Sequence, residues 1–110
     1  QAFARHVILG SKNPPTAVFV GGDLMSYGVM DTCIKNGVRI PEDLSIVGFD
    51  DIPFSGISMI SLTTVAHPYQ QIGELVAEKI TNRIHTPDKP VEQISLLPNL
   101  VLRGSTSPII

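Results

Sequence analysis

The hydrophobic pattern of this chain changes period between strand-like and helix-like segments. Residues 16–20 and 44–49 are short runs of apolar residues, which are typical of parallel strands buried on both faces. Between them, residues 24–36 have apolar positions on one helical face, and Gly37 is expected to form a left-handed C-terminal cap. The positions on this face are Leu24, Met25, Val29, Met30, Cys33 and Ile34. Strand, helix and strand in this order predict a βαβ unit, and therefore an α/β fold with a parallel sheet and flanking helices.

The second half of the chain has one long amphipathic pattern between weaker strand patterns. Residues 62–65 predict a short strand. Residues 69–85 predict a helix whose charged side chains lie largely opposite its apolar face. That face consists of Tyr69, Ile72, Leu75, Val76, Ile80 and Ile84. Two more strand-like runs, residues 94–97 and 100–103, are separated by Pro98, which cannot donate a ladder hydrogen bond.

Two other segments complete the organisation of the chain. Residues 2–9 have the pattern of the end of a helix, which Gly10 closes. Residues 52–61 form an irregular loop with several large apolar side chains. Because such a loop is too apolar for a freely solvated connection, we expect it to pack against another surface.

Composition and charge exclude several classes of function. Ten acidic and eight basic residues give a net charge of −2, and no basic cluster marks a nucleic-acid surface on this segment. The single cysteine, Cys33, excludes an internal disulfide framework and is expected to be a buried hydrophobe in a reducing compartment. No apolar run approaches the roughly 20 residues that span a bilayer. The amino end does not have the pattern of a signal peptide, but this absence carries little weight, because a sequence that starts at Gln1 is expected to be a fragment of a longer protein. With the reducing compartment that Cys33 indicates, the expected location is the cytoplasm.

Two adjacent carboxylates follow the apolar run at residues 44–49. Open α/β sheets bind ligands just beyond the carboxyl ends of such strands, so Asp50 is the strongest candidate for a ligand contact. Asp51 is a weaker candidate, because an aspartate in a turn often braces the following loop. Asp23 follows the first strand at a tight turn. It is predicted to be the N-cap of the next helix, with ligand contact as the alternative.

The chain offers little support for catalysis or for metal binding. His6, His67 and His85 are scattered, and no spacing of cysteine, histidine and carboxylate residues fits a metal site. The paired carboxylates lack the positioned partner that general acid/base catalysis requires. No Gly-x-Ser-x-Gly motif or glycine-rich phosphate loop is present. We therefore predict neither an enzyme nor a cofactor or metal site.

Four segments occur in an order that is more specific than any one of them. They are Pro15-Thr16-Ala17-Val18-Phe19-Val20-Gly21-Gly22-Asp23-Leu24-Met25, Val38-Arg39-Ile40-Pro41-Glu42-Asp43-Leu44-Ser45-Ile46-Val47-Gly48-Phe49-Asp50-Asp51-Ile52-Pro53, Leu62-Thr63-Thr64-Val65 with Pro68, and Leu97-Pro98 with Leu100-Val101-Leu102-Arg103-Gly104-Ser105-Thr106. Through these segments the chain resembles the carboxyl-terminal part of the effector-binding region of the lactose/galactose-repressor family of bacterial transcription regulators.

The resemblance implies a periplasmic-binding-protein-like fold of two α/β lobes, with a small-molecule effector in the cleft between them. Residues 1–66 would belong to the carboxyl-terminal lobe. Residues 67–97 would belong to the amino-terminal lobe, with chain crossings near 67 and 97, and residues 98–110 would be the return strand and tail. The helix-turn-helix module that binds DNA would lie outside this chain, no membrane would be involved, and the protein would be a homodimer.

The resemblance also implies roles for individual positions. Asp50 would accept hydrogen bonds from sugar hydroxyls or purine N–H groups, and His67 would contact either the ligand or the hinge backbone. Gly22 departs from the family, in which many members carry an asparagine that contacts the effector. The residues implied at the dimer contact are Tyr27, Phe54, Ile57 and Met59. The alternative role of these four residues is to cover the local core.

The leading interpretation is therefore the effector-binding fragment of a repressor that senses a sugar or a purine-like ligand and transmits the signal to its DNA-binding module. A periplasmic sugar-binding protein of a transport system, which shares the two-lobed fold, is the alternative. An unrelated flavodoxin-like α/β enzyme would rest on fold analogy alone. The sequence leaves open whether the effector acts as an inducer or as a corepressor.

Overall fold

The computed structural model describes residues 2 and 4–109 and divides the chain into two compact units. The first unit contains the residues up to 66 together with those from 100 onward, and the second contains residues 67–99. The two units are described separately. No helix among the described residues combines the length and the apolar character needed to cross a membrane.

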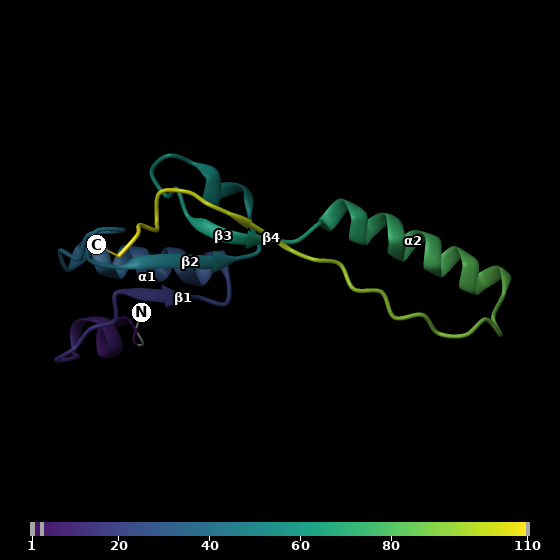
Figure 1. Ribbon diagram of the computed structural model, residues 1–110, viewed down its shortest axis with the longest axis horizontal. Helices are drawn as coiled ribbons and strands as arrows, with labels where there is room; N and C mark the ends of the chain where they lie inside the picture. Colours follow the sequence, from purple (N-terminus) through teal and green to yellow (C-terminus); the bar gives the residue numbers. More distant parts are fainter. Residues whose placement is uncertain (1, 3, 110) are drawn as a thin grey trace. The chain divides into compact units, whose positions relative to one another are not determined.

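A four-stranded sheet, whose first three strands are parallel, forms the centre of the first unit (Figure 1). Its strands are β1 (Ala17–Phe19), β2 (Ser45–Phe49), β3 (Thr63–Ala66) and β4 (Asn99–Val101), in the order β1-β2-β3-β4. Strands β1 and β2 are parallel, as are β2 and β3, with Gly48 opposite Thr64. The predicted βαβ unit is confirmed, because the two strands flanking the first helix lie side by side and point the same way.

Helix α1 (Asp23–Lys35) packs on this sheet through only part of its predicted apolar face. Val29, Met30 and Cys33 are buried against the strands, next to the buried side chains of Leu44, Ile46 and Leu62. In contrast, the side chains of Leu24, Met25 and Ile34 are exposed, so the predicted face is too wide. Gly37 ends the helix with φ of +75°, which agrees with the predicted left-handed cap.

The prediction that the first strand is buried on both faces is wrong for this chain. Strand β1 lies at the edge of the sheet, and Phe19 keeps 64% of its surface exposed. Its ring contacts that of Phe49 edge to face, with 6.2 Å between ring centroids. Val18 and Val20 point the other way and pack against the core. The apolar run therefore predicts the strand correctly, but the face that carries Phe19 stays largely exposed.

The helix predicted at residues 2–9 is a short π-helix, Ala4–Leu9, packed against α1 through Ala4 and Ile8. Position 3 of the prediction lies outside the described residues. The loop after β2 contains a 3-10 helix, η2 (Pro53–Gly56), in which Ser55 is buried. The expected packing of this loop against another surface is seen in part, because Ile60 packs against the core, whereas Phe54, Ile57 and Met59 are exposed.

The second unit consists of helix α2 (Tyr69–His85), with the bounds predicted from the sequence, and an extended return segment. No residue of α2 is buried. The return segment runs along the helix (Figure 1), and the two border an apolar groove of about 420 Å³ whose lining includes Ile72, Val76 and Ile94. The strand predicted at residues 94–97 is not formed. A strand requires a hydrogen-bonded neighbour, and the described chain offers none at this position.

Candidate functional site

The two aspartates after β2 occupy an unusual backbone conformation. Asp50 has φ of 108° and Asp51 has φ of 53°, values that residues with a Cβ rarely adopt. Strain of this kind persists only where the surroundings hold the backbone, and it is concentrated at functional sites. One restraint is the Asp50 backbone N–H, which donates to the Val65 carbonyl at 2.9 Å. Both side chains are half-buried at the carboxyl edge of the sheet, which is where open α/β sheets bind ligands.

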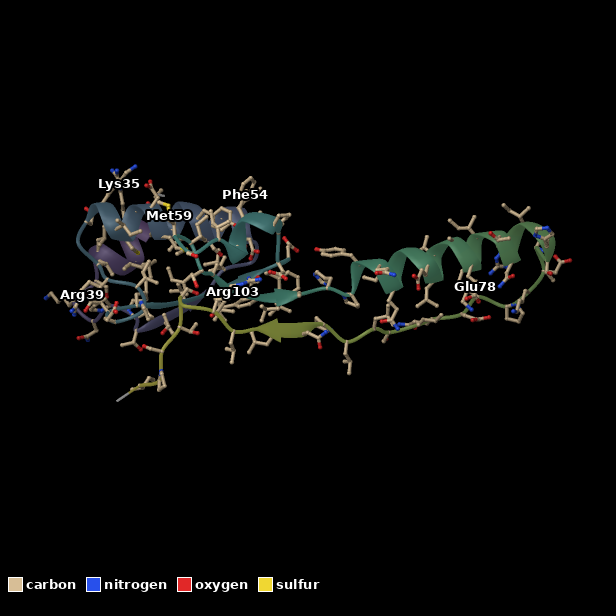
Figure 2. The ribbon with its side chains drawn as sticks, turned by 90° about the horizontal axis from the view of Figure 1, so that it is seen from above. Lys35, Arg39, Phe54, Met59, Glu78 and Arg103 are labelled. Atoms are coloured by element: carbon tan, nitrogen blue, oxygen red, sulfur yellow. The ribbon has the colours of Figure 1, made fainter. Side chains whose placement is uncertain are left out.

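Asp51 is held by an ion pair with Arg103. The Arg103 Nη2 atom donates to Asp51 Oδ1 at 2.7 Å, and its Nη1 atom donates to the Leu62 carbonyl at 2.9 Å. The Arg103 backbone N–H also donates to the Thr63 hydroxyl at 2.9 Å. Figure 2 shows the labelled Arg103 side chain within the first unit. One Asp51 oxygen is thereby engaged in bracing the turn, which is the alternative role that its sequence position suggests.

Gly22 and Asp50 lie next to each other at this edge. A Cβ atom placed on Gly22 would lie 3.7 Å from Asp50 Oδ2 and 3.4 Å from the Met25 Cε atom. The glycine therefore leaves a space beside the Asp50 carboxylate that an asparagine would fill. A carboxylate has several acceptor positions, so Asp50 is suited to receive hydroxyl or N–H donors there.

The prediction that Asp23 is the N-cap of α1 is wrong. Gly22 occupies the N-cap position and Asp23 is the first helical residue, with no side-chain capping hydrogen bond. The Asp23 side chain is only 1% exposed and turns into the protein. Its Oδ1 atom accepts a hydrogen bond from the Thr64 hydroxyl at 2.6 Å, and its Oδ2 atom accepts one from the Ile52 backbone N–H at 3.0 Å. The Ser55 hydroxyl also donates to Oδ2.

Sequence reasoning missed the partners of Asp23, because isolated serine and threonine residues carry no pattern. One signal was available in Gly48, a glycine inside an apolar strand, since such a glycine often marks a close approach. A Cβ atom on Gly48 would lie 2.3 Å from Asp23 Oδ1 and 2.8 Å from the Leu62 Cδ2 atom. The absence of a side chain at Gly48 therefore leaves the space that the Asp23 carboxylate occupies.

His67, the candidate at the predicted crossing, belongs to the second unit. Its ring lies 5.4 Å from that of Tyr69, measured between centroids, with the planes tilted by 58°. The Tyr69 backbone N–H donates to the His67 carbonyl at 2.9 Å. The role of His67 toward a ligand stays a prediction.

The four residues implied at a dimer contact form two groups. Tyr27 is half-buried, and its hydroxyl lies 2.6 Å from the Ser55 Oγ atom, which joins α1 to the loop after β2. Phe54, Ile57 and Met59 are exposed, Met59 to 93%. Figure 2 shows the labelled Phe54 and Met59 side chains on the same side of the unit as Lys35 of α1. A groove of about 580 Å³, lined in part by Ile34 and Met59, continues this surface.

The remaining titratable groups add no further site. Within residues 2 and 4–109, no three histidine, cysteine or acidic side chains are grouped as metal ligands. The Cys33 side chain is buried, and this burial raises the pKa of its thiol. Such a thiol is less reactive than an exposed one at neutral pH.

The sequence matches the periplasmic-binding-protein-like domain over residues 2–106. The chain belongs to this family. Among its relatives is a probable HTH-type transcriptional repressor, ExuR, of Bacillus subtilis strain 168, which is 39% identical over 105 residues that make up 96% of this chain and 31% of the repressor. A second is the HTH-type transcriptional repressor PurR of Serratia proteamaculans strain 568, 34% identical over 94% of this chain and 30% of the repressor.

Solved structures of transcriptional regulators have the same fold. A LacI-family transcriptional regulator from Enterococcus faecalis V583 with bound ribose matches 97% of this chain and 40% of its own, with 33% identity and a TM-score of 0.86. The regulator CelR in complex with cellobiose matches 82% of this chain and 28% of its own, with 29% identity and a TM-score of 0.76. The resemblance to the lactose/galactose-repressor family is confirmed. Both curated relatives are transcriptional repressors rather than enzymes or transport proteins, and the chain spans about 31% of the length of the first.

Proposed function

We propose that this chain is the effector-binding part of a bacterial transcription regulator that controls a DNA-binding module elsewhere in the protein. The observation that carries the proposal is the Asp50 carboxylate, presented by a left-handed turn at the carboxyl edge of the sheet and facing the space that Gly22 leaves. The repressor names of the relatives support the regulatory role over the transport alternative. Such a regulator would act in the cytoplasm, where its operator is located.

The effector that fits this site best is a sugar. Sugar hydroxyls donate readily to a carboxylate, and two similar transcriptional regulators have structures with bound ribose and cellobiose. A purine-like effector with N–H donors is the second candidate. In this proposal residues 67–97 belong to the other lobe, with crossings near 67 and 97, and His67 faces the ligand from one crossing.

The proposed mechanism is a shift between two orientations of the lobes. An effector bound between them favours the orientation in which it makes better contacts, and the regulator transmits that orientation to its DNA-binding module. The size of the shift is limited by the difference in effector affinity between the two orientations.

We further propose that two copies of the regulator associate through Tyr27, Phe54, Ile57 and Met59. A two-fold interface uses the same patch on both subunits, and an exposed apolar surface made by two neighbouring segments suits this arrangement. Sedimentation of the full-length protein should show monomers when Tyr27→Asp and Phe54→Asp are combined. The variant Leu24→Asp, on another exposed position of α1, is the control that should remain dimeric.

Calorimetry on the full-length protein with ribose, cellobiose and purine bases tests the effector site. Asp50→Ala should weaken binding of the effector by about tenfold to a hundredfold, because it removes a charged hydrogen-bond acceptor worth about 1.5–3 kcal/mol. Asp31→Ala, which removes an exposed carboxylate on α1, should leave affinity unchanged. A folded Asp50→Ala variant with the affinity of the parent protein would contradict the assignment.

A further inference from the structure

One buried carboxylate connects three segments of the first unit. Asp23 lies in the first turn of α1, and the Thr64 hydroxyl that donates to its Oδ1 atom belongs to β3. The two donors to its Oδ2 atom, the Ile52 backbone N–H and the Ser55 hydroxyl, belong to the segment after β2. These partners surround a side chain that is 1% exposed, so it has no accessible surface for a ligand. The role of Asp23 must therefore be sought in the segments that it joins.

The hydrogen bonds around Ser55 have a defined direction. A carboxylate only accepts hydrogen bonds, so the single hydroxyl hydrogen of Ser55 is donated to Asp23. The Tyr27 hydroxyl, 2.6 Å from Ser55 Oγ, must then be the donor in that contact. Because Ser55 is fully buried, losing either partner would leave one of its two hydrogen bonds unmade in the interior. The segment after β2 is thus held to α1 at Ile52 and again at Ser55.

The strained turn lies between two backbone anchors. The Asp50 N–H donates to the Val65 carbonyl at 2.9 Å, and the Ile52 N–H donates to Asp23 at 3.0 Å. Asp50 and Asp51, which both have positive φ, are the residues that lie between these two anchored N–H groups. Strained backbone is maintained only by surroundings that over-determine it, and Asp23 supplies the second anchor.

We propose that Asp23 is a positioning residue that holds the Asp50–Asp51 turn in the conformation that presents Asp50 to the effector. That Asp50 contacts an effector rests on the proposed function, whereas the restraint on the turn does not. Asp23 acts through the backbone of Ile52 and the hydroxyl of Ser55, without contact to the effector. The restraint preorganises the carboxylate, so that binding does not have to order the turn.

Amide hydrogen exchange in the full-length protein tests the restraint without any ligand. In Asp23→Asn and in Ser55→Ala, the Ile52 amide should exchange about tenfold faster than the overall loss of stability of each variant predicts. The matched control is Thr32→Val. It also removes a buried hydroxyl, but one that lies on α1 away from the turn and donates to the Gly28 carbonyl. An Ile52 amide that exchanges in both variants as it does in Thr32→Val, after correction for stability, would overturn the proposal. If Asp23→Asn does not fold, Ser55→Ala decides.

Ribose binding to the same proteins separates this proposal from the proposed function. If Asp23 acts through Asp50, Asp23→Asn should weaken ribose affinity about tenfold in the parent background and have little effect once Asp50→Ala is present. Equal losses in both backgrounds would overturn the positioning role. If Asp50→Ala leaves ribose affinity unchanged, the assignment of Asp50 is wrong, and if the parent protein does not bind ribose, ribose is not its effector. In both cases the exchange result alone decides the role of Asp23.

Discussion

The two units of the chain are built from similar sequence patterns but differ in what those patterns bury. In the first unit, Leu44, Ile46 and Leu62 are at most 1% exposed. Every buried side-chain nitrogen or oxygen in the described part of the chain has a hydrogen-bond partner. In the second unit, α2 has the more regular amphipathic pattern, yet none of its residues is buried. A periodic pattern therefore predicts the helix, but burial depends on a partner surface.

The difference suggests that the apolar face of α2 is made for a surface outside the described residues. Relatives such as ExuR contain this region as about 31% of their length, so in those proteins other segments are available to cover it. By the proposed assignment of residues 67–97 to the second lobe, that cover is the sheet of the amino-terminal lobe. This proposal can be tested by comparing core substitutions in the two units.

The largest expected contrast is between Leu62→Ala, directly before β3, and Leu75→Ala in α2. In the 110-residue chain, Leu62→Ala should lower the free energy of unfolding by about 2–5 kcal/mol, because it leaves a cavity in a closed core. Leu75→Ala should lower it by less than about 1 kcal/mol, because its side chain is only partly covered. Urea denaturation measures both values.

The same pair of substitutions should behave differently in the full-length protein. There the cost of Leu75→Ala should rise toward that of Leu62→Ala, since a covered leucine leaves a cavity when it is shortened. A cost for Leu75→Ala that stays small in the full-length protein would show that α2 is exposed there too, and would contradict the assignment of this helix to a second lobe.

The sequence predicts the positions of helices and strands better than it predicts which of their residues are buried or paired. The bounds of α2 were predicted to the residue, because its apolar positions recur with helical spacing over 17 residues. The parallel βαβ unit was also predicted, because crossover geometry leaves few alternatives. The exposure of Phe19 and the absence of a strand at residues 94–97 could not be predicted, because both depend on which neighbours the chain provides.

The candidate site was predictable only where a strand pattern ends. Asp50 directly follows an apolar run, which makes it a candidate, and the structure places it at the carboxyl edge of the sheet. The buried environment of Asp23 was misread, because an aspartate before a helix has the same local sequence whether it caps the helix or turns inward. Its partners Ser55 and Thr64 are more than 30 residues away in sequence, at separations of 32 and 41, and no local pattern links them.

Two glycines provide a contrast of opposite sign between the units. Gly48→Ala should lower the free energy of unfolding by about 3 kcal/mol, because the new Cβ would lie 2.3 Å from Asp23 Oδ1. Gly73→Ala in α2 should raise the free energy of unfolding by about 0.5–1 kcal/mol, because the new Cβ meets no atom within 4 Å beyond its chain neighbours and its own helix backbone, and alanine favours helices. Thermal unfolding followed by circular dichroism measures both effects. A Gly48→Ala variant as stable as the parent chain would show that the buried carboxylate is less tightly enclosed than the structure indicates.

The smallest effects are expected for exposed ion pairs, and one pair from each unit, Arg39–Asp43 and Lys79–Glu92, makes the comparison. In the first unit, hydrogen bonds from the side chain and backbone of Arg39 lower the pKa of Asp43 from 3.8 to about 2. In the second, the hydrogen bond from Lys79 lowers the pKa of Glu92 below its ordinary 4.5. Both carboxyl groups have a lower pKa in the folded chain than in the unfolded chain. They therefore stabilise the folded chain at pH values above their ordinary pKa. For Asp43, this contribution is lost as the pH falls from 3.8 through about 2.

An NMR titration of the side-chain carboxyl groups should therefore give an Asp43 midpoint near pH 2 and a depressed midpoint for Glu92. Arg39→Gln should return the pKa of Asp43 toward 3.8 and leave Glu92 unchanged, because each pair lies within its own unit. Lys79→Gln should have the reverse pattern. Both pairs are exposed and screened by salt, so neither substitution should change the midpoint of urea unfolding at pH 7 by much. An Asp43 pKa that stays near 2 without the Arg39 guanidinium would assign the shift to the backbone N–H of residue 39, which donates to Asp43 Oδ2 at 2.9 Å.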